Sequence, residues 1–433
     1  MRHFARIAAI AAAALLPIAA SAQDISDYMV MRTDRLSAVY AIGDTVRVIA
    51  DVASVPPHTV NLNVFTGGYR ENSIKEGPLD VRVGENILYE GVFDSPSEVM
   101  VSLTSEGSDE YMCGFLVAPE KFNPGFKAPK DLLRFWRREI REMRDLPMVS
   151  KVVPIEGDKE RGEGFETFDV EVNCVGPKPV RGYMVHPKGA KQHSLPIVIF
   201  LHAAGSTPGT QAHVSTATDF AAYGALAIDI NAHGFLNGQP DQYYYDLYAG
   251  ELLDYSKREP KSREDYYFKW MFLRAQRALD FMVTNPLWDG KHIVVVGTSQ
   301  GGAQSAFLAG IDRRVTTAVL TVPAMIDQGA YLDGRYPSWP KAATKYPDKA
   351  DICRYFDPAL LLGRTRASIW CEVGLYDLTC PPANVYAGIN QARGFKVVIP
   401  TQRGHTIRKS NQQKYHHPVL MNQIDFTRAE LKK

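Results

Sequence analysis

The sequence predicts an α/β fold with a mostly parallel sheet, preceded by a small all-β sandwich. Three observations predict it. From about residue 165, strands and helices alternate, which is typical of a parallel sheet covered by helices on both faces. Before that, residues 24 to about 118 contain short strands separated by turn residues, as in a β-sandwich. Within the alternating region, HIVVVGTSQGGAQ (residues 292–304) joins a buried strand to a helix through a glycine-rich turn.

The first 23 residues, MRHFARIAAIAAAALLPIAASAQ, predict a secretory signal peptide over residues 1–22. Arg2 and Arg6 form a basic start, an apolar run follows, and Ala20-Ser21-Ala22 stands before Gln23. We expect cleavage after Ala22 and a periplasmic or secreted mature protein. No later segment is long and apolar enough to span a bilayer, so no membrane association is expected.

Composition argues against several kinds of partner. A formal net charge of +1 gives no reason to expect binding to nucleic acid or to an anionic membrane. The cysteines, Cys113, Cys174, Cys353, Cys371 and Cys380, are scattered and show no metal-ligand spacing. We expect no disulfide framework, no metal and no cofactor. Whether two of the last three cysteines form a disulfide stays open, as does the formation of a homo-oligomer.

Residues 23–118 are expected to form the accessory sandwich, with candidate strands beginning at Thr45, Val60, Asn86, Glu98 and Tyr111. No catalytic cluster stands out in them.

Residues 119–164 are expected to bridge the two domains. Pro129 near a helix start and the apolar spacing of the residues that follow predict an amphipathic helix. Its apolar face consists of Leu132, Leu133, Trp136, Ile140 and Met143. Its Arg/Glu face is expected to be solvated.

Residues 165–433 are expected to form the catalytic domain. A hairpin comes first, followed by a strand from Pro196, a helix over 212–223, a strand from Ala225 and a helix over 270–282. After the strand and helix around residue 299, strands begin at Thr316, Ala367 and Phe395, and a final helix begins at about Pro418. A hairpin leading into parallel strands, with a serine turn after a mid-sheet strand, is the α/β-hydrolase arrangement.

Ser299 is the candidate nucleophile. Gly297 and Gly301 let the strand and the helix approach each other without a Cβ clash. The turn would lift the hydroxyl clear of the sheet and leave backbone N–H groups at a helix N-terminus, where they can hold an oxyanion. A serine that only caps the helix is the alternative. The strand before it and the helix after it favour a nucleophile.

The fold predicts a catalytic acid after a later strand and a histidine after the last strand. Asp377 follows the strand ASIWCEVG, and His405 follows FKVVIP in a glycine-containing loop. Ser299 would attack, His405 would take its proton, and Asp377 would orient the imidazole. Rival residues do not fit these places, because Asp351 and Asp357 precede the strand and His416 and His417 lie farther along the chain.

The oxyanion hole needs two N–H donors. Gln300 would supply the first, and Ala203 or Ala204, after the strand that ends at His202, the second. His202 itself is expected to be structural.

These motifs resemble carbohydrate esterase family seven, the acetyl xylan esterases and cephalosporin C deacetylases, over roughly residues 119–433. GTSQGG is similar to that family's G-x-S-Q-G-G, and VGLYDLTCPPANVYAGIN resembles the stretch that bears its catalytic aspartate. PKDLLRFW and DYYFKWMFLRAQRALDFMVTNP also resemble family segments. The resemblance implies hydrolysis of small esters, chiefly acetyl groups on sugars, without a metal.

The chain departs from the family at several positions. Ala232-His233-Gly234 stands in place of Arg-Gly-Gln, His202-Ala203-Ala204 in place of His-Gly-Tyr, and Thr406 replaces a glutamate after the histidine. A leading β-sandwich is not part of the basic family. The sequence therefore predicts a divergent relative.

Two insertions, residues 241–248 and 331–346, are expected to lie in loops on the triad side of the sheet. Aromatic rings stack on sugars, which makes their tyrosines and tryptophan candidates for substrate binding. The candidates are Tyr243, Tyr244, Tyr245, Tyr336 and Trp339. Packing within a lid is the alternative for each of them.

The predicted function is that of a secreted serine esterase removing short acyl groups from carbohydrates such as acetylated xylan or xylo-oligosaccharides. A serine peptidase of the prolyl oligopeptidase kind is one alternative, although such enzymes usually carry a propeller far larger than the leading region here. A non-catalytic hydrolase fold that serves as a binding module is another, and the presence of all three triad residues argues against it.

Overall fold

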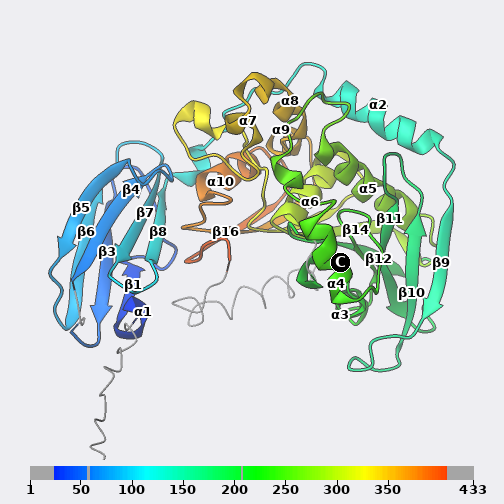
Figure 1. Ribbon diagram of the computed structural model, residues 1–433, viewed down its shortest axis with the longest axis horizontal. Coiled ribbons are helices and arrows are strands. Elements are labelled where there is room, and N and C mark those ends of the chain that lie inside the picture. Colours follow the sequence, from blue (N-terminus) through cyan, green and yellow to red (C-terminus); the bar gives the residue numbers. More distant parts are fainter. Residues whose placement is uncertain (1–23, 56–58, 206–207, 407–433) are drawn as a thin grey trace, which may run out of the picture.

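The computed structural model describes residues 24–55, 59–205 and 208–406. A nine-stranded sheet flanked by helices forms the larger part, and a β-rich region formed by the N-terminal residues lies beside one end of this sheet (Figure 1). The predicted α/β fold class is confirmed. The predicted signal peptide, the rival histidines His416 and His417, and the helix expected from about Pro418 lie outside the described residues.

The large sheet has the strand order β17-β16-β15-β14-β12-β13-β11-β10-β9. Neighbouring strands from β13 to β17 pair in parallel, whereas β9, β10 and β11 pair antiparallel and β11 joins β13 antiparallel. The strands are β9 (Ser150–Ile155), β10 (Phe165–Val172), β11 (Val180–Pro187), β12 (Leu195–Leu201), β13 (Leu226–Ile230), β14 (Trp288–Thr298), β15 (Thr317–Thr321), β16 (Ser368–Gly374) and β17 (Lys396–Thr401).

Both faces of the central strands are buried, as the unbroken apolar runs predict. Alternate residues point to opposite sides. Ile293 and Val295 of β14 belong to the main core beneath helices α5 (Tyr267–Met282) and α6 (Gln300–Ile311), whereas Val294 and Val296 belong to a second core beneath α3 (Val214–Ala221). The carboxyl ends of β12, β14, β16 and β17 therefore meet at one edge of a rigid, fully packed sheet.

Helices cover this sheet and extend its core. The helices of eight residues or more are α2 (Leu132–Asp145), α3 (Val214–Ala221), α4 (Asp241–Ala249), α5 (Tyr267–Met282), α6 (Gln300–Ile311) and α10 (Pro382–Asn390). Shorter helical segments are α1 (Ile25–Tyr28), η1 (Pro119–Lys121), η2 (Pro208–Thr210), η3 (Tyr255–Lys257), η4 (Ala330–Asp333), α7 (Ala342–Lys345), η5 (Pro347–Lys349), α8 (Ala350–Cys353), η6 (Arg354–Phe356) and α9 (Ala359–Leu362).

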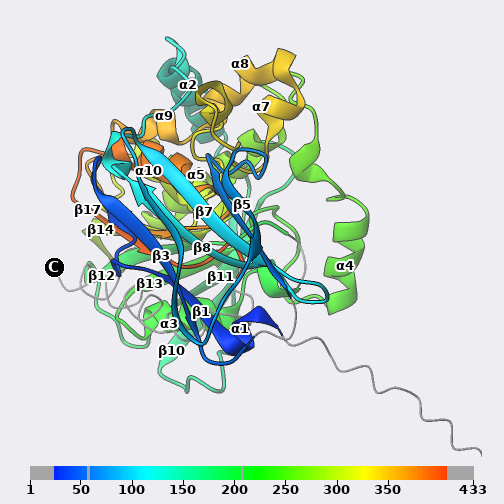
Figure 2. The ribbon, with the colours of Figure 1, turned by 90° about the vertical axis from the view of Figure 1, so that its left-hand side faces the viewer.

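The N-terminal region consists of two small sheets that face each other (Figure 2). One has the order β1-β3-β6 and the other β2-β8-β7-β4-β5. The strands are β1 (Met29–Thr33), β2 (Val39–Tyr40), β3 (Thr45–Val52), β4 (Val60–Thr66), β5 (Ser73–Leu79), β6 (Gly84–Val92), β7 (Ser97–Thr104) and β8 (Tyr111–Val117). We call these two sheets the sandwich. The domain boundaries at residues 118 and 164 stay predictions.

The sandwich lies at the β16–β17 end of the large sheet and bonds directly to its loops (Figure 1). Glu98 of β7 accepts the Ala383 N–H of α10 at 2.9 Å, and the Tyr336 N–H donates to the Gly67 carbonyl at 2.7 Å. A Cβ on Gly114 of β8 would clash with the Leu375 carbonyl oxygen, so only glycine permits this approach. The sandwich is thus built against the loops that follow β16 and β17.

Several elements differ from the sequence-based expectation. The strands β1, β2, β5 and β9 were not predicted; β5 and β9 are edge strands with mostly exposed residues, so they lack the apolar alternation that predicts strands. Residues 241–248 form helix α4 rather than a loop. The Arg/Glu face of α2 is not wholly solvated, because Glu139 is buried and pairs with Lys269 at 3.0 Å.

The structure also shows the state of the cysteines and the character of the helices. All five cysteines are free thiols, and Cys353, Cys371 and Cys380 form no disulfide. Among residues 24–55, 59–205 and 208–406, no helix has both the length and the apolar character needed to cross a membrane.

Candidate active site

Ser299 occupies a sharp turn between β14 and α6. Its backbone has φ 55° and ψ −116°, a strained combination for a residue with a side chain. The turn requires glycine on both sides of Ser299. A Cβ at Gly297 would clash with the Gly301 carbonyl, and a Cβ at Gly301 would clash with the Leu201 carbonyl. The Ser299 N–H donates to the Thr321 carbonyl at 2.9 Å, which anchors the turn to β15. The hydroxyl is held above the carboxyl end of the sheet.

Three side chains form a chain of hydrogen bonds at this edge of the sheet. Ser299 Oγ lies 2.9 Å from His405 Nε2, and His405 Nδ1 lies 2.8 Å from Asp377 Oδ2. Asp377 is fully buried, and its Oδ1 accepts the N–H groups of Thr379 and Cys380 at 2.7 and 2.8 Å. Because an ionised carboxylate only accepts, His405 donates through Nδ1, and its Nε2 is then free to accept the serine proton. The structure brings the three predicted residues together.

The described rival acids lie elsewhere. Asp357 is fully buried and accepts the N–H groups of Asp327, Gln328 and Ala359, which is a structural role. Burial raises its pKa to about 8. Asp351 is exposed and pairs with Arg354 at 3.1 Å.

A buried ion pair supports the histidine loop. Arg403 Nη1 donates to Glu372 of β16 at 3.1 Å, and its Nη2 donates to the His405 carbonyl at 2.9 Å. Both side chains are less than one tenth exposed, so the bonds are shielded from water. This pair fixes the backbone of His405 relative to β16. Sequence reasoning missed it, because neither residue belongs to a recognisable motif.

The expected oxyanion donors flank the turn. Gln300 begins α6, so its N–H is not used within the helix. The close contact of Gly301 with the Leu201 carbonyl places the start of α6 against the end of β12, from which Ala203 and Ala204 follow. His202 Nε2 lies 2.5 Å from buried Asp229, so this histidine is engaged within the structure.

Tyr255 is a further residue at this site that sequence reasoning missed. It is buried, and its hydroxyl donates to Gln300 Oε1 at 2.5 Å. The bond holds the Gln300 side chain against η3 and thereby steadies the residue next to the nucleophile. Its position in a segment without strand or helix periodicity gave no signal.

Comparison with known proteins shows the family. Residues 117–332 match the model of the acetyl xylan esterase family (AXE1). The chain belongs to the acetyl xylan esterase family. It is accordingly a carboxylic ester hydrolase, and the suspected resemblance is confirmed. The matched range includes Ser299 but ends before Asp377 and His405, so the placement of these two rests on the geometry described above.

Individual relatives agree with this assignment. The chain is 26% identical over 336 residues to the acetyl esterase Axe7A of Xylanibacter ruminicola, covering 76% of this chain and 75% of that protein. The structure superimposes on an acetyl xylan esterase from Paenibacillus sp. R4 with a TM-score of 0.57 and 21% identity, over 71% of this chain and 98% of that one. For acetyl xylan esterase 1 of Thermoanaerobacterium sp. JW/SL YS485 the TM-score is 0.54 and the identity 18%, over 71% and 97%.

The aromatic candidates of the two insertions of this esterase have different surroundings. Tyr244 is buried and its hydroxyl donates to the Leu236 carbonyl, which is packing within the fold rather than an open platform. The Tyr243 hydroxyl accepts the Leu236 N–H at 3.3 Å, and Tyr245 is half exposed. These three residues therefore do not act as one surface.

The two aromatic candidates of the second insertion, Tyr336 and Trp339, also have different surroundings. The ring of Tyr336 packs edge-on against Tyr69 of the sandwich, 5.0 Å between centroids. Trp339 is half-buried, and its backbone N–H donates to the carbonyl of Thr379, two residues beyond Asp377. Trp339 is thus joined by a backbone hydrogen bond to the loop that carries Asp377.

A metal does not fit the donors at this site. Asp377, Cys380 and His405 each place one potential ligand atom within 4.8 Å of the others. However, Asp377 already accepts two backbone N–H groups in addition to His405. Burial raises the pKa of the Cys380 thiol well above its usual range, whereas metals bind the thiolate. This arrangement suits proton transfer along the hydrogen-bond chain.

Proposed function

We propose that this protein is a secreted or periplasmic serine esterase that removes acetyl groups from carbohydrates such as acetylated xylan or xylo-oligosaccharides. The observation that carries the proposal is the hydrogen-bond chain from Ser299 through His405 to Asp377 on a strained strand-to-helix turn. Acetylated sugars are proposed as substrates because the family model and the named relatives are acetyl esterases or acetyl xylan esterases.

In the first half-reaction, Ser299 Oγ attacks the acetyl carbonyl carbon while His405 Nε2 takes the hydroxyl proton. Asp377 stabilises the resulting imidazolium through Nδ1–H. The negative charge that develops on the carbonyl oxygen would be held by the N–H of Gln300 and by an N–H of the Ala203–Ala204 segment. As the tetrahedral intermediate collapses, the ester bond breaks and His405 gives its proton to the sugar oxygen, leaving an acetyl-serine.

In the second half-reaction, water replaces the sugar. His405 takes a proton from the water, whose oxygen attacks the acetyl carbon. Collapse of this intermediate releases acetate and returns the proton to Ser299. The sum is one ester and one water converted to one alcohol and one acid, with no redox change.

Two activity measurements test this function. We expect hydrolysis of p-nitrophenyl acetate and release of free acetate from acetylated xylan, both abolished in Ser299→Ala. Peptide p-nitroanilides serve as the comparison substrate, because a serine peptidase would cleave them. Cleavage of the anilides without acetate release from acetylated xylan would contradict the proposal.

A further inference from the structure

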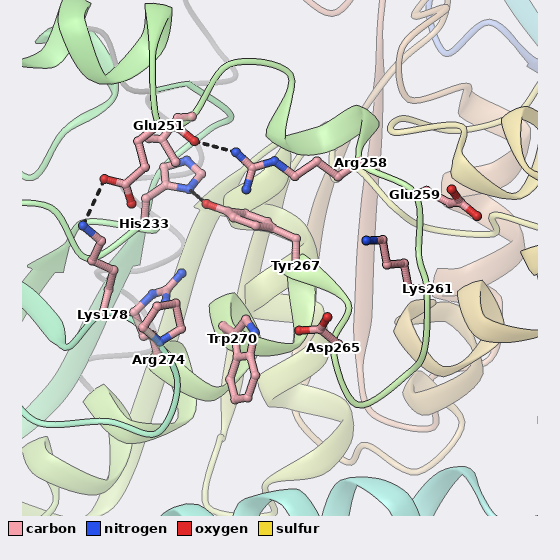
Figure 3. A pocket seen from close by; sticks show the side chains of 12 residues that line it. Lys178, His233, Glu251, Arg258, Glu259, Lys261, Asp265, Tyr267, Trp270 and Arg274 are labelled. Carbon is pink, nitrogen blue, oxygen red and sulfur yellow. Dashed lines mark hydrogen bonds and ion pairs between the residues drawn. The ribbon is translucent and has the colours of Figure 1, made fainter.

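A cavity of about 640 Å³ lies between the loop after β13 and the first turns of α5 (Figure 3). Tyr267, Trp270 and Arg274 line it from one face of α5, because they are spaced three and four residues apart. His233, from the loop after β13, completes this wall. We call this space the α5 cavity. Ser299, His405 and Asp377 are not among its lining residues.

Arg274 differs from every other buried arginine in the described residues. Its side chain is 2% exposed, and only its Nε is used, donating to the Ala232 carbonyl at 3.0 Å. Neither Nη atom has a hydrogen-bond or ion-pair partner among residues 24–55, 59–205 and 208–406. By contrast, Arg277 donates to three carbonyl groups, and Arg335 and Arg403 pair with carboxylates. The buried guanidinium of Arg274 therefore presents two Nη amino groups, without hydrogen-bond acceptors in the described residues, to the cavity.

The neighbouring groups do not neutralise Arg274. Burial, followed by the charges of Arg274 and Arg258, lowers the pKa of His233 to about 3, so the imidazole is neutral and bonds to the Tyr267 hydroxyl at 2.7 Å. Glu251 is paired with Lys178 at 3.1 Å (Figure 3). Burial lowers the pKa of Arg274, and no carboxylate is among the groups that shift this pKa. The positive charge calls for an anionic ligand.

The rest of the lining restricts what that anion can be. The volume is in the range of small-molecule sites and is far larger than a simple inorganic anion requires. Asp265, Glu259 and Glu251 set three carboxylates against four cationic side chains in the lining, so its formal charge of +1 suits a singly charged anion better than a multiply charged one. The same carboxylates can accept hydroxyl groups, and the indole N–H of Trp270 can donate. A single carboxylate on a polyhydroxylated body satisfies all of these groups.

We propose that the α5 cavity binds a uronic acid residue of an acidic saccharide, with Arg274 holding its carboxylate. Bidentate pairing of a guanidinium with a carboxylate gives both strength and orientation. This inference rests on the proposed function, and it names an acidic, uronate-bearing saccharide as the substrate class.

One aromatic layer connects the α5 cavity with the catalytic turn. The ring of His233 packs against Tyr255 with 4.5 Å between centroids, and the Tyr255 hydroxyl bonds to Gln300. A uronate held by Arg274 would thus lie behind the residue that supplies an oxyanion donor.

Calorimetric titration of the mature protein tests the cavity directly. The probes are a xylotriose that carries one glucuronic acid and the same oligosaccharide with that carboxyl reduced to the alcohol. We expect the acid to bind at least about tenfold more tightly, since hydrogen bonds to charged groups are the strong ones. Arg274→Met should remove this preference, and Arg274→Lys should restore part of it. Arg366→Met, outside the cavity, is the matched control and should keep the full preference.

Equal binding of the acidic and reduced probes by the wild-type protein would overturn the inference, whether or not the Arg274 variants fold. Sodium acetate and phosphate are titrated in parallel, and either anion binding as tightly as the acidic probe would also overturn it. Hydrolysis of p-nitrophenyl acetate by the same wild-type sample separates the two claims. An active esterase without acid preference contradicts only the uronate site, whereas a protein inactive on every acetyl ester contradicts the proposed function.

Discussion

The side chain of Gln402 hydrogen-bonds both backbone groups of Gly114. Its Oε1 accepts the Gly114 N–H at 3.0 Å, and its Nε2 donates to the Gly114 carbonyl at 2.8 Å. Gly114 lies on β8 of the sandwich, and Gln402 lies three residues before His405. Together with the contact between Gly114 and Leu375, this bond makes the sandwich a support for the loops of both the candidate acid and the candidate base.

Replacing Gln402 with Ala should therefore impair catalysis as well as stability. The change leaves two backbone groups of Gly114 unpaired, and each such group costs about 1–3 kcal/mol when buried. We expect a lower Tm and a fall in kcat of about tenfold to a hundredfold, because small displacements of a catalytic group are costly. Thermal unfolding and p-nitrophenyl acetate kinetics measure the two effects. Gln391→Ala, at the C-terminal end of α10, is the control; an unchanged kcat in Gln402→Ala would show that the sandwich does not support the site.

The three residues of the hydrogen-bond chain should act as one unit. Ser299→Ala and His405→Ala should each lower kcat by about a thousandfold or more, with little change in Tm, and Asp377→Ala should cost less. Steady-state kinetics with circular dichroism as a folding control measure this. Activity that survives His405→Ala and disappears in His417→Ala would identify a different base.

Acyl specificity should favour acetate. Tyr255 bonds to Gln300, and Trp339 packs against Tyr255 with 6.4 Å between ring centroids, so we expect these two rings to close the space beyond the acetyl methyl group. We expect kcat/KM to fall from acetyl to butyryl esters, by about 1–3 kcal/mol for each methylene refused. Trp339→Ala should flatten the series, whereas Ala204→Tyr should hardly change it. A flat series in the wild-type protein would contradict a closed pocket.

Glu98 should make stability depend on pH. Burial raises its pKa to about 7, against the lowering effects of the Ala383 N–H and Arg335. A carboxyl whose pKa is higher in the folded state binds a proton more readily there. Its stabilising contribution is thus complete below about pH 4.5 and is lost as the pH rises through 7.

The corresponding variant is Glu98→Gln, which keeps an acceptor for the Ala383 N–H. The free energy of unfolding of the wild-type protein relative to this variant should fall between pH 5 and pH 8, by on the order of 3 kcal/mol. Urea unfolding at four pH values measures it, with exposed Glu106→Gln as the control. A difference that does not vary with pH would contradict a raised pKa.

Export should produce a mature chain that begins at Gln23. N-terminal sequencing of protein recovered from the periplasm or the medium of a bacterial host checks this. Stable, active, exported protein that still carries Met1 would contradict the signal peptide.

The parts of the fold that follow from the sequence are those with strong local patterns. Apolar runs identify β12 and β14, because strands buried on both faces need no polar residues. The turn at Ser299 is readable because its glycines are sterically required. Asp377 and His405 follow from topology alone, since the ends of parallel strands meet at one edge.

Features that depend on contacts between distant segments could not be predicted. Arg403 and Glu372 meet only once β16 and β17 are paired, and Tyr255 reaches Gln300 from a segment without periodicity. Residues 241–248 are expected in a loop from the sequence but form a helix, and Tyr244 of this helix packs on Phe235 from a separate segment. That Arg274 has no ion-pair partner in the described residues likewise follows only from the positions of the neighbouring carboxylates, which the sequence does not give.

The bond between Gly114 and Gln402 joins positions 288 residues apart. During synthesis Gly114 therefore leaves the ribosome long before Gln402 and His405 do. Strand β8 of the sandwich is thus synthesised well before the segment that it supports. A chain released before its final strand would carry Ser299 on a formed turn but no base to activate it. Hydrolysis therefore has to await the synthesis of the segment that carries His405 and its binding to β8.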